Sequence, residues 1–218
     1  MYFIIHGNDI QKYPHLADQM FRLRSRVFRD ELKWVASEGE HEADEYDGYN
    51  PVYVMHTDPL GIHLFACGRL MPTSGPTLLA DVFGETIPDV DFASPFVWEI
   101  TRLCIDDELI RKHGRDSERM AILRSLHVAA LEFGLSAGVD AFLANFDDLR
   151  LRMWRRMKVH FDVLGTSEAF STRVHLGITE CSQEILDQAR TRLGLSEPLL
   201  EDAPALLQPA PMRLAVAA

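Results

Sequence analysis

Strand-like and helix-like segments alternate along most of this chain, and that order restricts its fold more than any other feature of the sequence. Short runs typical of strands occupy residues 2–6, 52–56, 62–71, 97–105, 139–146, 160–165 and 172–178. Segments expected to form helices occupy residues 16–34, 117–137, 147–158 and 182–194. Such alternation predicts α/β layers built around one sheet.

The length of the chain favours a single domain. Its 218 residues are 47% hydrophobic, which is enough for one substantial core and excludes a wholly disordered chain. We therefore expect one domain over residues 1–195. The segment 196–218 holds four prolines among many alanines and is expected to be a mobile tail, with a docking arm for a partner as the alternative.

Charge and cysteine content exclude several functional classes. The formal net charge of -11 argues against general nucleic-acid binding, which needs a basic surface. No apolar run is long enough to span a membrane, and the first ten residues show no secretory signal, so we expect a cytoplasmic protein. Cys67, Cys104 and Cys181 match neither a metal-ligand spacing nor a disulfide framework, so we expect free thiols and no metal.

An irregular acidic run follows the first helix. Residues 38–47 carry six carboxylates and no Lys or Arg. A solvated loop is one interpretation. A site for a cationic ligand, such as an ammonium or a sulfonium, is the other. The spacing does not meet the EF-hand pattern, so calcium binding is not favoured.

Three arginines, Arg24, Arg69 and Arg102, lie inside otherwise apolar segments. A guanidinium in a strand interior is costly unless it meets a carboxylate, so Arg69 is expected to pair with Asp44 or Asp47. An arginine of this kind can also hold a substrate carboxylate with two hydrogen bonds. The sequence leaves both roles open.

The strand at 97–105 also carries Glu99. Strict alternation would place Glu99, Thr101 and Leu103 on one face and Arg102 on the other, with Trp98 and Ile100. A buried glutamate can have its pKa raised towards neutrality and act as a general base. Pairing of Glu99 with an arginine is the structural alternative.

Aromatic and basic residues complete the candidate site. Phe28, Trp34 and Phe83 flank the polar groups in sequence and could form core or stack on a purine and shield a cation. A basic run without acids follows the strand at 139–146 and consists of Arg150, Arg152, Arg155, Arg156 and Lys158. It is either an exposed helix face or a docking surface for an acidic partner or a polyphosphate.

Taken in order, these residues resemble the LuxI-type acyl-homoserine-lactone synthases, which make quorum-sensing autoinducers. The resemblance covers residues 20 to 165 and rests on five short motifs in family order. They are Arg24-x-x-x-Phe28-x-x-x-x-x-Trp34, Glu42-x-Asp44-x-x-Asp47, Arg69-Leu70-Met71-Pro72-Thr73, Leu79-x-Asp81-x-Phe83 and Trp98-Glu99-x-Thr101-Arg102.

The resemblance implies a fold and a reaction. The fold is that of the GCN5-related acetyltransferases, a three-layer sandwich with a splayed central mixed sheet. In the reaction, the amine of S-adenosylmethionine, a substrate and no cofactor, attacks an acyl thioester, and lactone closure releases methylthioadenosine. It assigns catalysis to Glu99, Arg102 and Asp47, and S-adenosylmethionine binding to Arg24, Phe28, Trp34, Asp44, Asp47, Arg69, Phe83 and Arg102.

The resemblance also assigns an acyl pocket to the helix at 117–137 and the strand at 139–146. Thr101, Phe142 and Phe146 are the residues expected there, and the two bulky rings favour a short, branched or aryl acyl group. Lys158 stands where many family members have glycine. The basic run would meet coenzyme A or an acyl carrier protein, with coenzyme A preferred.

Two other functions remain open at this point. One is an N-acetyltransferase that uses acetyl-CoA. Residues Arg111 to Asp116 carry only half of the pyrophosphate-binding loop of such enzymes, because Asp116 replaces the second small residue. The other is a non-catalytic binding module, which would not need the whole set of polar strand residues.

Overall fold

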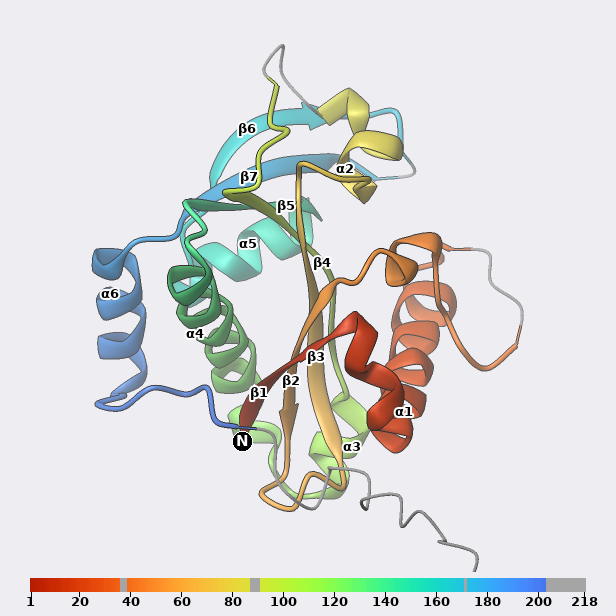
Figure 1. Cartoon of the computed structure of the whole chain (residues 1–218), viewed down its shortest axis with the longest axis vertical. Helices are drawn as coiled ribbons and strands as arrows, with labels where there is room; N and C mark the ends of the chain where they lie inside the picture. Colours follow the sequence, from red (N-terminus) through yellow and green to blue (C-terminus); the bar gives the residue numbers. More distant parts are fainter. Residues whose placement is uncertain (36–38, 87–90, 171, 203–218) are drawn as a thin grey trace, which may run out of the picture.

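The computed structural model describes residues 1–35, 39–86, 91–170 and 172–202, and contains one seven-stranded mixed sheet (Figure 1). The strand order is β1-β2-β3-β4-β5-β7-β6, and every neighbouring pair is antiparallel except β4 and β5. The strands are β1 (Tyr2–His6), β2 (Val52–Thr57), β3 (Leu64–Pro72), β4 (Val97–Ile105), β5 (Ala141–Asp147), β6 (Asp162–Ser167) and β7 (Val174–Glu180). All seven strands predicted from the sequence are present, with ends shifted by a few residues.

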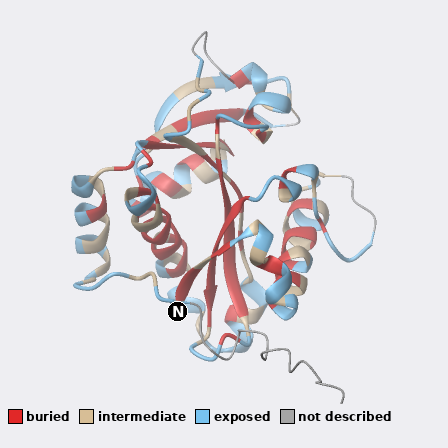
Figure 2. Cartoon of the chain, viewed as in Figure 1, coloured by how far each residue is buried: buried red, intermediate tan, exposed pale blue. Residues whose placement is uncertain are grey.

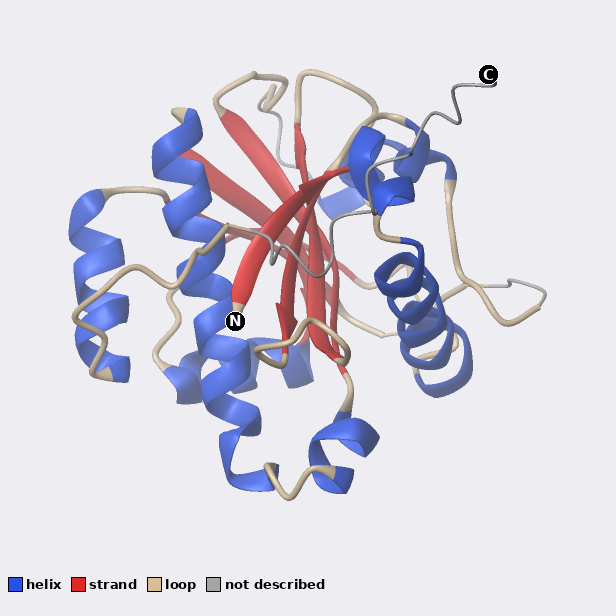
Figure 3. Ribbon diagram, turned by 60° about the horizontal axis from the view of Figure 1, so that its bottom comes forward, coloured by secondary structure: helices blue, strands red, loops and turns tan. Residues whose placement is uncertain are grey.

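Helices cover both faces of the sheet, which is the predicted three-layer arrangement (Figure 3). The helices are α1 (Pro14–Arg24), α2 (Leu78–Asp81), α3 (Asp107–Lys112), α4 (Arg119–Ala137), α5 (Asp148–Met157) and α6 (Gln183–Leu193). The long helix expected over residues 16–34 is α-helical only to Arg24 and continues as a π-helix, η2 (Ser25–Glu31). Four short 3-10 helices are η1 (Gly7–Lys12), η3 (Glu45–Gly48), η4 (Gly84–Thr86) and η5 (Asp116–Glu118). The sequence patterns did not indicate α3.

The sheet is buried along most of its length (Figure 2). One core, formed by Phe3, Leu16 and Met20 among others, joins α1 to β1 and β2. The other large core joins the opposite face to α4 and includes Phe65 and Leu131. By length and composition α4 could cross a membrane, but 67% of its apolar window is buried inside the protein, as in the central helix of a globular core.

The parallel strands β4 and β5 pair over only part of their length. The pairing runs from Val97 to Ile100 on β4 and from Ala141 to Ala144 on β5. Beyond these residues β4 continues to Ile105 and β5 to Asp147 without pairing to one another. The sheet is therefore open in its middle, as the splayed sheet of the sequence-based expectation required.

A bulge in β4 changes which side chains share a face. Cys67 pairs with Cys104 and Arg69 with Thr101, so β4 has one residue more than β3 in this stretch. The bulge includes Arg102, whose φ of 51° lies in the left-handed region. The expected alternation is therefore wrong beyond Thr101: Arg102 joins Glu99 and Thr101 on the α1 side, and Leu103 packs into the core on the α4 side.

The start of the C-terminal segment is held against the body. The backbone N–H groups of Leu199 and Leu200 donate to the Glu132 carboxylate, and Leu200 forms a parallel bridge with Tyr2 at the edge of β1. The expected mobile tail therefore does not begin at residue 196. Residues 203–218, with most of the prolines of that expectation, lie outside the described residues.

Candidate active site

The acidic loop and the arginines of α1, β3 and β4 form one buried cluster of charges. Arg24, at the end of α1, donates from Nε to Glu42 (2.6 Å) and from both Nη atoms to Asp47 (2.8 and 2.9 Å). Asp47 also accepts from the hydroxyl of Tyr53 on β2 (2.8 Å). Arg24 and Glu42 are only 1% and 2% exposed, so these charges have left bulk water and depend on one another.

Arg69 and Arg102 extend the cluster towards β4. Arg69 donates to both oxygens of Asp44, to Asp47 (3.0 Å) and, from Nε, to the hydroxyl of Thr101 (3.0 Å). Arg102 donates to Asp44 (2.8 Å) and to Glu42 (2.9 Å). The predicted pairing of Arg69 with Asp44 or Asp47 is confirmed, because Arg69 contacts both.

The cluster is electrically balanced and locally rigid. Burial alone would raise the pKa of Asp47, but hydrogen bonds and charge from Arg24, with the charge of Arg69, hold that pKa well below its ordinary range. A capping box at the start of η3 fixes the acidic loop. In it the Asp44 side chain accepts the backbone N–H of Asp47, and the Asp47 side chain accepts the backbone N–H of Asp44. Glu42, Asp44 and Asp47 of the acidic run are therefore no part of a solvated loop, whereas Glu45 between them is exposed. Of its other members, Glu40 is exposed and pairs with Arg22, whereas Glu38 lies outside the described residues.

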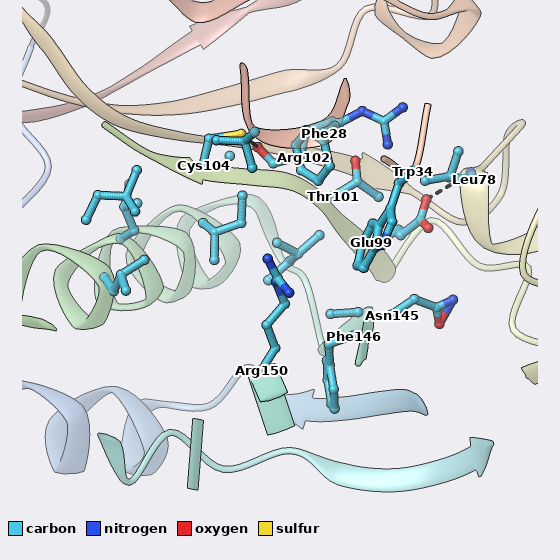
Figure 4. Close-up of a pocket in the computed structure, with 18 of the residues that line it drawn as sticks. Phe28, Trp34, Leu78, Glu99, Thr101, Arg102, Cys104, Asn145, Phe146 and Arg150 are labelled. Carbon is cyan, nitrogen blue, oxygen red and sulfur yellow. Dashed lines mark hydrogen bonds between the residues drawn. The ribbon is translucent and has the colours of Figure 1, made fainter. Parts of the chain in front are cut away.

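A cavity of about 530 Å³ begins at this cluster and passes through the open middle of the sheet (Figure 4). On the α1 side its walls include Phe28, Trp34, Tyr46 and Phe83. On the α4 side they are mostly apolar and comprise Leu123, Leu126, His127, Ala130, Ala144, Phe146, Met153, Trp154 and Phe161. One continuous space thus joins a charged, aromatic compartment to an apolar one.

Only part of the charge cluster reaches this cavity. Asp44, Thr101 and Arg102 line it, whereas Arg24, Asp47 and Arg69 lie behind them. The structure thus brings together the five charged residues that the resemblance assigned to S-adenosylmethionine binding, with Thr101 of the acyl set beside them. It places Asp44 and Arg102 where a ligand can touch them, and the others where they position those two.

Glu99 lines the cavity where the two compartments meet, with its carboxylate directed towards Leu78 (Figure 4). Its Oε2 accepts the backbone N–H of Leu78 at the start of α2 (3.1 Å), while its buried Oε1 has no hydrogen-bond partner in the described structure. Burial raises the pKa of Glu99 to about 7, against the opposing charge of Arg69 and the backbone hydrogen bonds. Glu99 forms no ion pair with an arginine among the described residues, so the structural alternative for this residue is not met.

The three predicted aromatic residues all line the cavity. Phe28 lies under the guanidinium of Arg102 (5.0 Å to the ring centre) and next to Trp34, with ring centres 6.2 Å apart. Phe83 packs against Phe170 at the other rim. They therefore do not serve the core alone, and they give the charged compartment an aromatic wall.

Two residues lie in places other than those predicted: Phe142 of the acyl set is outside the cavity, and Arg150 of the docking set is inside it. Phe142 does not line the cavity: its ring packs against Gly134 of α4, so closely that a Cβ on Gly134 would lie 2.8 Å from it. Arg150 does line the cavity, with its guanidinium 5.3 Å from the Trp34 ring centre and bonded to Asp147. Sequence patterns could not reveal either position, because each depends on how a helix, α4 for Phe142 and α5 for Arg150, packs in the folded protein.

The remaining basic residues, Arg152, Arg155, Arg156 and Lys158, are exposed on α5 and just after it. Lys158 adopts a left-handed conformation (φ 58°) at the C-terminal cap of α5. Glycine adopts this conformation without strain, so it would fit this cap better than lysine does. The half-motif of residues 111–116 forms the end of α3 and the turn after it, and none of these residues lines the cavity.

Sequence reasoning missed several residues of the site. Glu42 was quoted in a motif but given no role, although it joins Arg24 to Arg102. Its place two residues before the capping pair of Asp44 and Asp47 was the available signal. Tyr53 and His127 gave no signal, because each lies within an apolar stretch that reads as core. No group of His, Cys, Asp or Glu in the described ranges has the arrangement of a metal site. Cys67, Cys104 and Cys181 are free and buried, as expected.

Comparisons with known proteins agree with this geometry. The family model "Autoinducer synthase" matches residues 9–189. The acyl-homoserine-lactone synthase of Rhizobium etli is 31% identical over 204 residues, covering 91% of this chain and 90% of that protein. The solved structure of TofI in a ternary complex with an inhibitor and MTA is 26% identical, with a TM-score of 0.68, and covers 91% of this chain and 98% of TofI.

Further solved structures confirm the fold class. BjaI, a CoA-dependent acyl-homoserine lactone synthase solved with SAM and isopentyl-CoA, superposes with a TM-score of 0.76 at 23% identity over 94% of each chain. A putative N-acetyltransferase from Lactobacillus plantarum gives 0.52 at 18% identity, over 83% of this chain and 99% of that one. The shared fold of both enzyme classes is the one the resemblance predicted, and the chain belongs to the autoinducer synthase family.

Proposed function

We propose that this protein acylates the amine of S-adenosylmethionine with an acyl thioester and closes the product to an acyl-homoserine lactone, releasing methylthioadenosine. The observation that carries the proposal is the position of Glu99. Glu99 lines the cavity where the charged compartment meets the apolar one, and its buried Oε1 has no hydrogen-bond partner among the described residues. A base at that junction can reach an amine held on one side and a thioester carbonyl held on the other.

The charged compartment matches S-adenosylmethionine group by group. Arg102 can hold the carboxylate, since the guanidinium already lies at the cavity surface. Asp44 can attract the ammonium or the sulfonium, and the rings of Phe28 and Trp34 can stack on adenine or shield the sulfonium. Arg24, Asp47 and Arg69 position these groups from behind. We propose no cofactor.

The chemistry needs two steps at one place. In the first, Glu99 accepts a proton from the ammonium, directly or through a water, and the free amine attacks the thioester carbon. The new amide bond forms as the C–S bond breaks, and the thiol leaves with a proton. In the second, the methionine carboxylate attacks its own γ-carbon, which breaks the bond to the sulfonium and releases methylthioadenosine as the lactone closes. Arg102 would hold the carboxylate in reach of that carbon.

We propose a short, branched or aryl acyl group, carried by coenzyme A. Phe142 no longer supports this, because it lies outside the cavity. The support comes from Phe146, Phe161 and Trp154, whose rings pack together, with centres 5.4 and 5.9 Å from Phe161, at the apolar compartment. The exposed cations of α5 would meet phosphates of the carrier. Both substrates are cytoplasmic metabolites, so we place the enzyme there.

The test is release of methylthioadenosine from S-adenosylmethionine by the purified chain, measured with and without acyl thioester. One acyl group is supplied both on coenzyme A and on acyl carrier protein, and initial rates are compared. The proposal expects thioester-dependent release and a faster rate with coenzyme A. No release with any thioester would overturn the assigned reaction, whereas a large preference for carrier protein would overturn the carrier alone.

A further inference from the structure

The wall of the apolar compartment includes a histidine that the reaction does not use. His127 of α4 is 9% exposed and lies between Leu123, Leu126 and Ala130, which line the same wall. Burial is the only influence on its pKa, with no contribution from a hydrogen bond, and the residue lines the cavity, so its ring is placed to pair with a ligand there. Desolvation alone lowers the pKa of His127 to about 4, so its imidazole is neutral near pH 7 and offers one N–H donor and one acceptor.

The surroundings of His127 explain why it stays neutral and where it can form a hydrogen bond. Its ring lies 6.1 Å from Phe161, within the aromatic group at this compartment. On its other side a small second pocket, about 120 Å³, is lined by Arg124, Lys158 and Arg192 among others, and the charges of these three would oppose a further cation. His127 is thus a wall between the two spaces. It is on the opposite face of the sheet from the charge cluster, at the part of the cavity that an acyl group would fill.

We propose that His127 selects the acyl group, by hydrogen bonding to an oxygen atom, hydroxyl or carbonyl, that the acyl chain carries beyond its thioester carbonyl. The inference rests on the proposed function and deepens it, because it names a chemical class of acyl donor. An acyl group without such an oxygen offers the imidazole no partner in a compartment whose walls are mostly apolar. A site built around a buried polar group discriminates most strongly against ligands that leave it unpaired.

The test uses matched pairs of coenzyme A thioesters that differ only by oxygen. Butanoyl-CoA is compared with 3-hydroxybutanoyl-CoA and 3-oxobutanoyl-CoA, and 3-phenylpropanoyl-CoA with its 4-hydroxyphenyl analogue. In each pair kcat/KM is measured by release of methylthioadenosine. We expect the wild-type chain to prefer an oxygenated member of at least one pair by about tenfold or more. Which pair shows the preference locates the oxygen along an alkyl chain or on a ring.

Two variants at position 127 separate selection from packing. His127→Leu keeps the volume and removes the hydrogen bond, so the preference should fall to within about twofold, with the apolar thioester used at least as well as before. His127→Gln keeps a donor and an acceptor and should retain part of the preference. If His127 is only a packing residue, both variants change the two members of a pair equally, and that result overturns the inference.

The thermal midpoint supplies a readout that does not depend on substrate. An unpaired imidazole in the core destabilises the fold, so His127→Leu should raise the midpoint of the free enzyme. A lower midpoint for His127→Leu would show that the ring is a structural residue and would also overturn the inference. Equal wild-type rates on all matched pairs would do the same while leaving the synthase activity in place. Absence of release with every thioester, by contrast, would mark a failure of the proposed function itself.

Discussion

Arg24 and Asp47 form a two-pronged ion pair, with Nη1–Oδ1 and Nη2–Oδ2 distances of 2.8 and 2.9 Å, behind the wall of the cavity. Neither residue lines the cavity, so the pair acts by holding Asp44 and Arg102 in place through the shared network. A bidentate pair of this kind, with two parallel hydrogen bonds, fixes the orientation of both side chains as well as the distance between them. The ligand-facing charges are thus set by residues that a ligand does not touch.

Asp47→Asn should abolish lactone formation and lower stability. The substitution leaves the guanidinium groups of Arg24 and Arg69 short of one negative charge in a buried place, which costs about 3 kcal/mol or more of unfolding free energy. Denaturant unfolding and methylthioadenosine release measure the two effects. Asp18→Asn, which removes an exposed partner of Arg22, is the matched control and should change neither. An active, fully stable Asp47→Asn protein would contradict the role of the cluster.

Glu99→Gln should lower kcat with the KM for S-adenosylmethionine largely retained, because it removes the base and keeps the shape. In the wild-type enzyme kcat/KM should rise with pH through about 7, the pKa to which burial raises Glu99. In the variant this rise should disappear. A normal rate with the wild-type pH profile would show that the base lies elsewhere.

The same pKa has a consequence for stability. The pKa of Glu99 is about 7 when folded and 4.5 when it is exposed, so between these values the folded state binds more protons than the unfolded state. The free energy of unfolding should therefore fall as pH rises from 4.5 to 7, by an amount on the order of 3 kcal/mol from this group. Glu99→Gln should remove that contribution and be the more stable protein at pH 8. Parallel stability curves for the two proteins would contradict the burial of an uncompensated carboxyl.

Much of the fold followed from the sequence, because strand alternation and the long helix 117–137 are local signals. The bulge at Arg102 was not predictable, since a left-handed arginine in a strand gives no composition signal, and it reversed the facing of Arg102 and Leu103. Phe142 was misplaced for a similar reason. Its contact with Gly134 depends on how closely α4 approaches β5, which only the packed structure specifies.

Trp34→Ala should raise the apparent KM for S-adenosylmethionine about tenfold or more and leave the KM for the thioester nearly unchanged. Trp34 stands beside Phe28 on the charged side and under the guanidinium of Arg150. Trp34→Phe keeps a ring and should lose less. Equal increases for both substrates would indicate general packing in place of a substrate wall.

Lys158→Gly should stabilise the protein. Lys158 has a φ of 58°, which glycine adopts without strain, so the gain should be about 1 kcal/mol, or roughly 3 °C in the thermal midpoint. Arg155→Gly, three residues earlier and within the helical range of α5, is the control and should lower the midpoint. A lower midpoint for Lys158→Gly would mean that its side chain, and not the backbone, determines this cap.

The most direct measurement is a mass spectrum of the lactones extracted from cells that express the chain, compared with cells that express Glu99→Gln at the same protein level. The account predicts an acyl-homoserine lactone with a short, branched or aryl acyl group from the wild-type protein, and far less of it from the variant. No lactone from the wild-type protein, or equal amounts from both, would contradict the account.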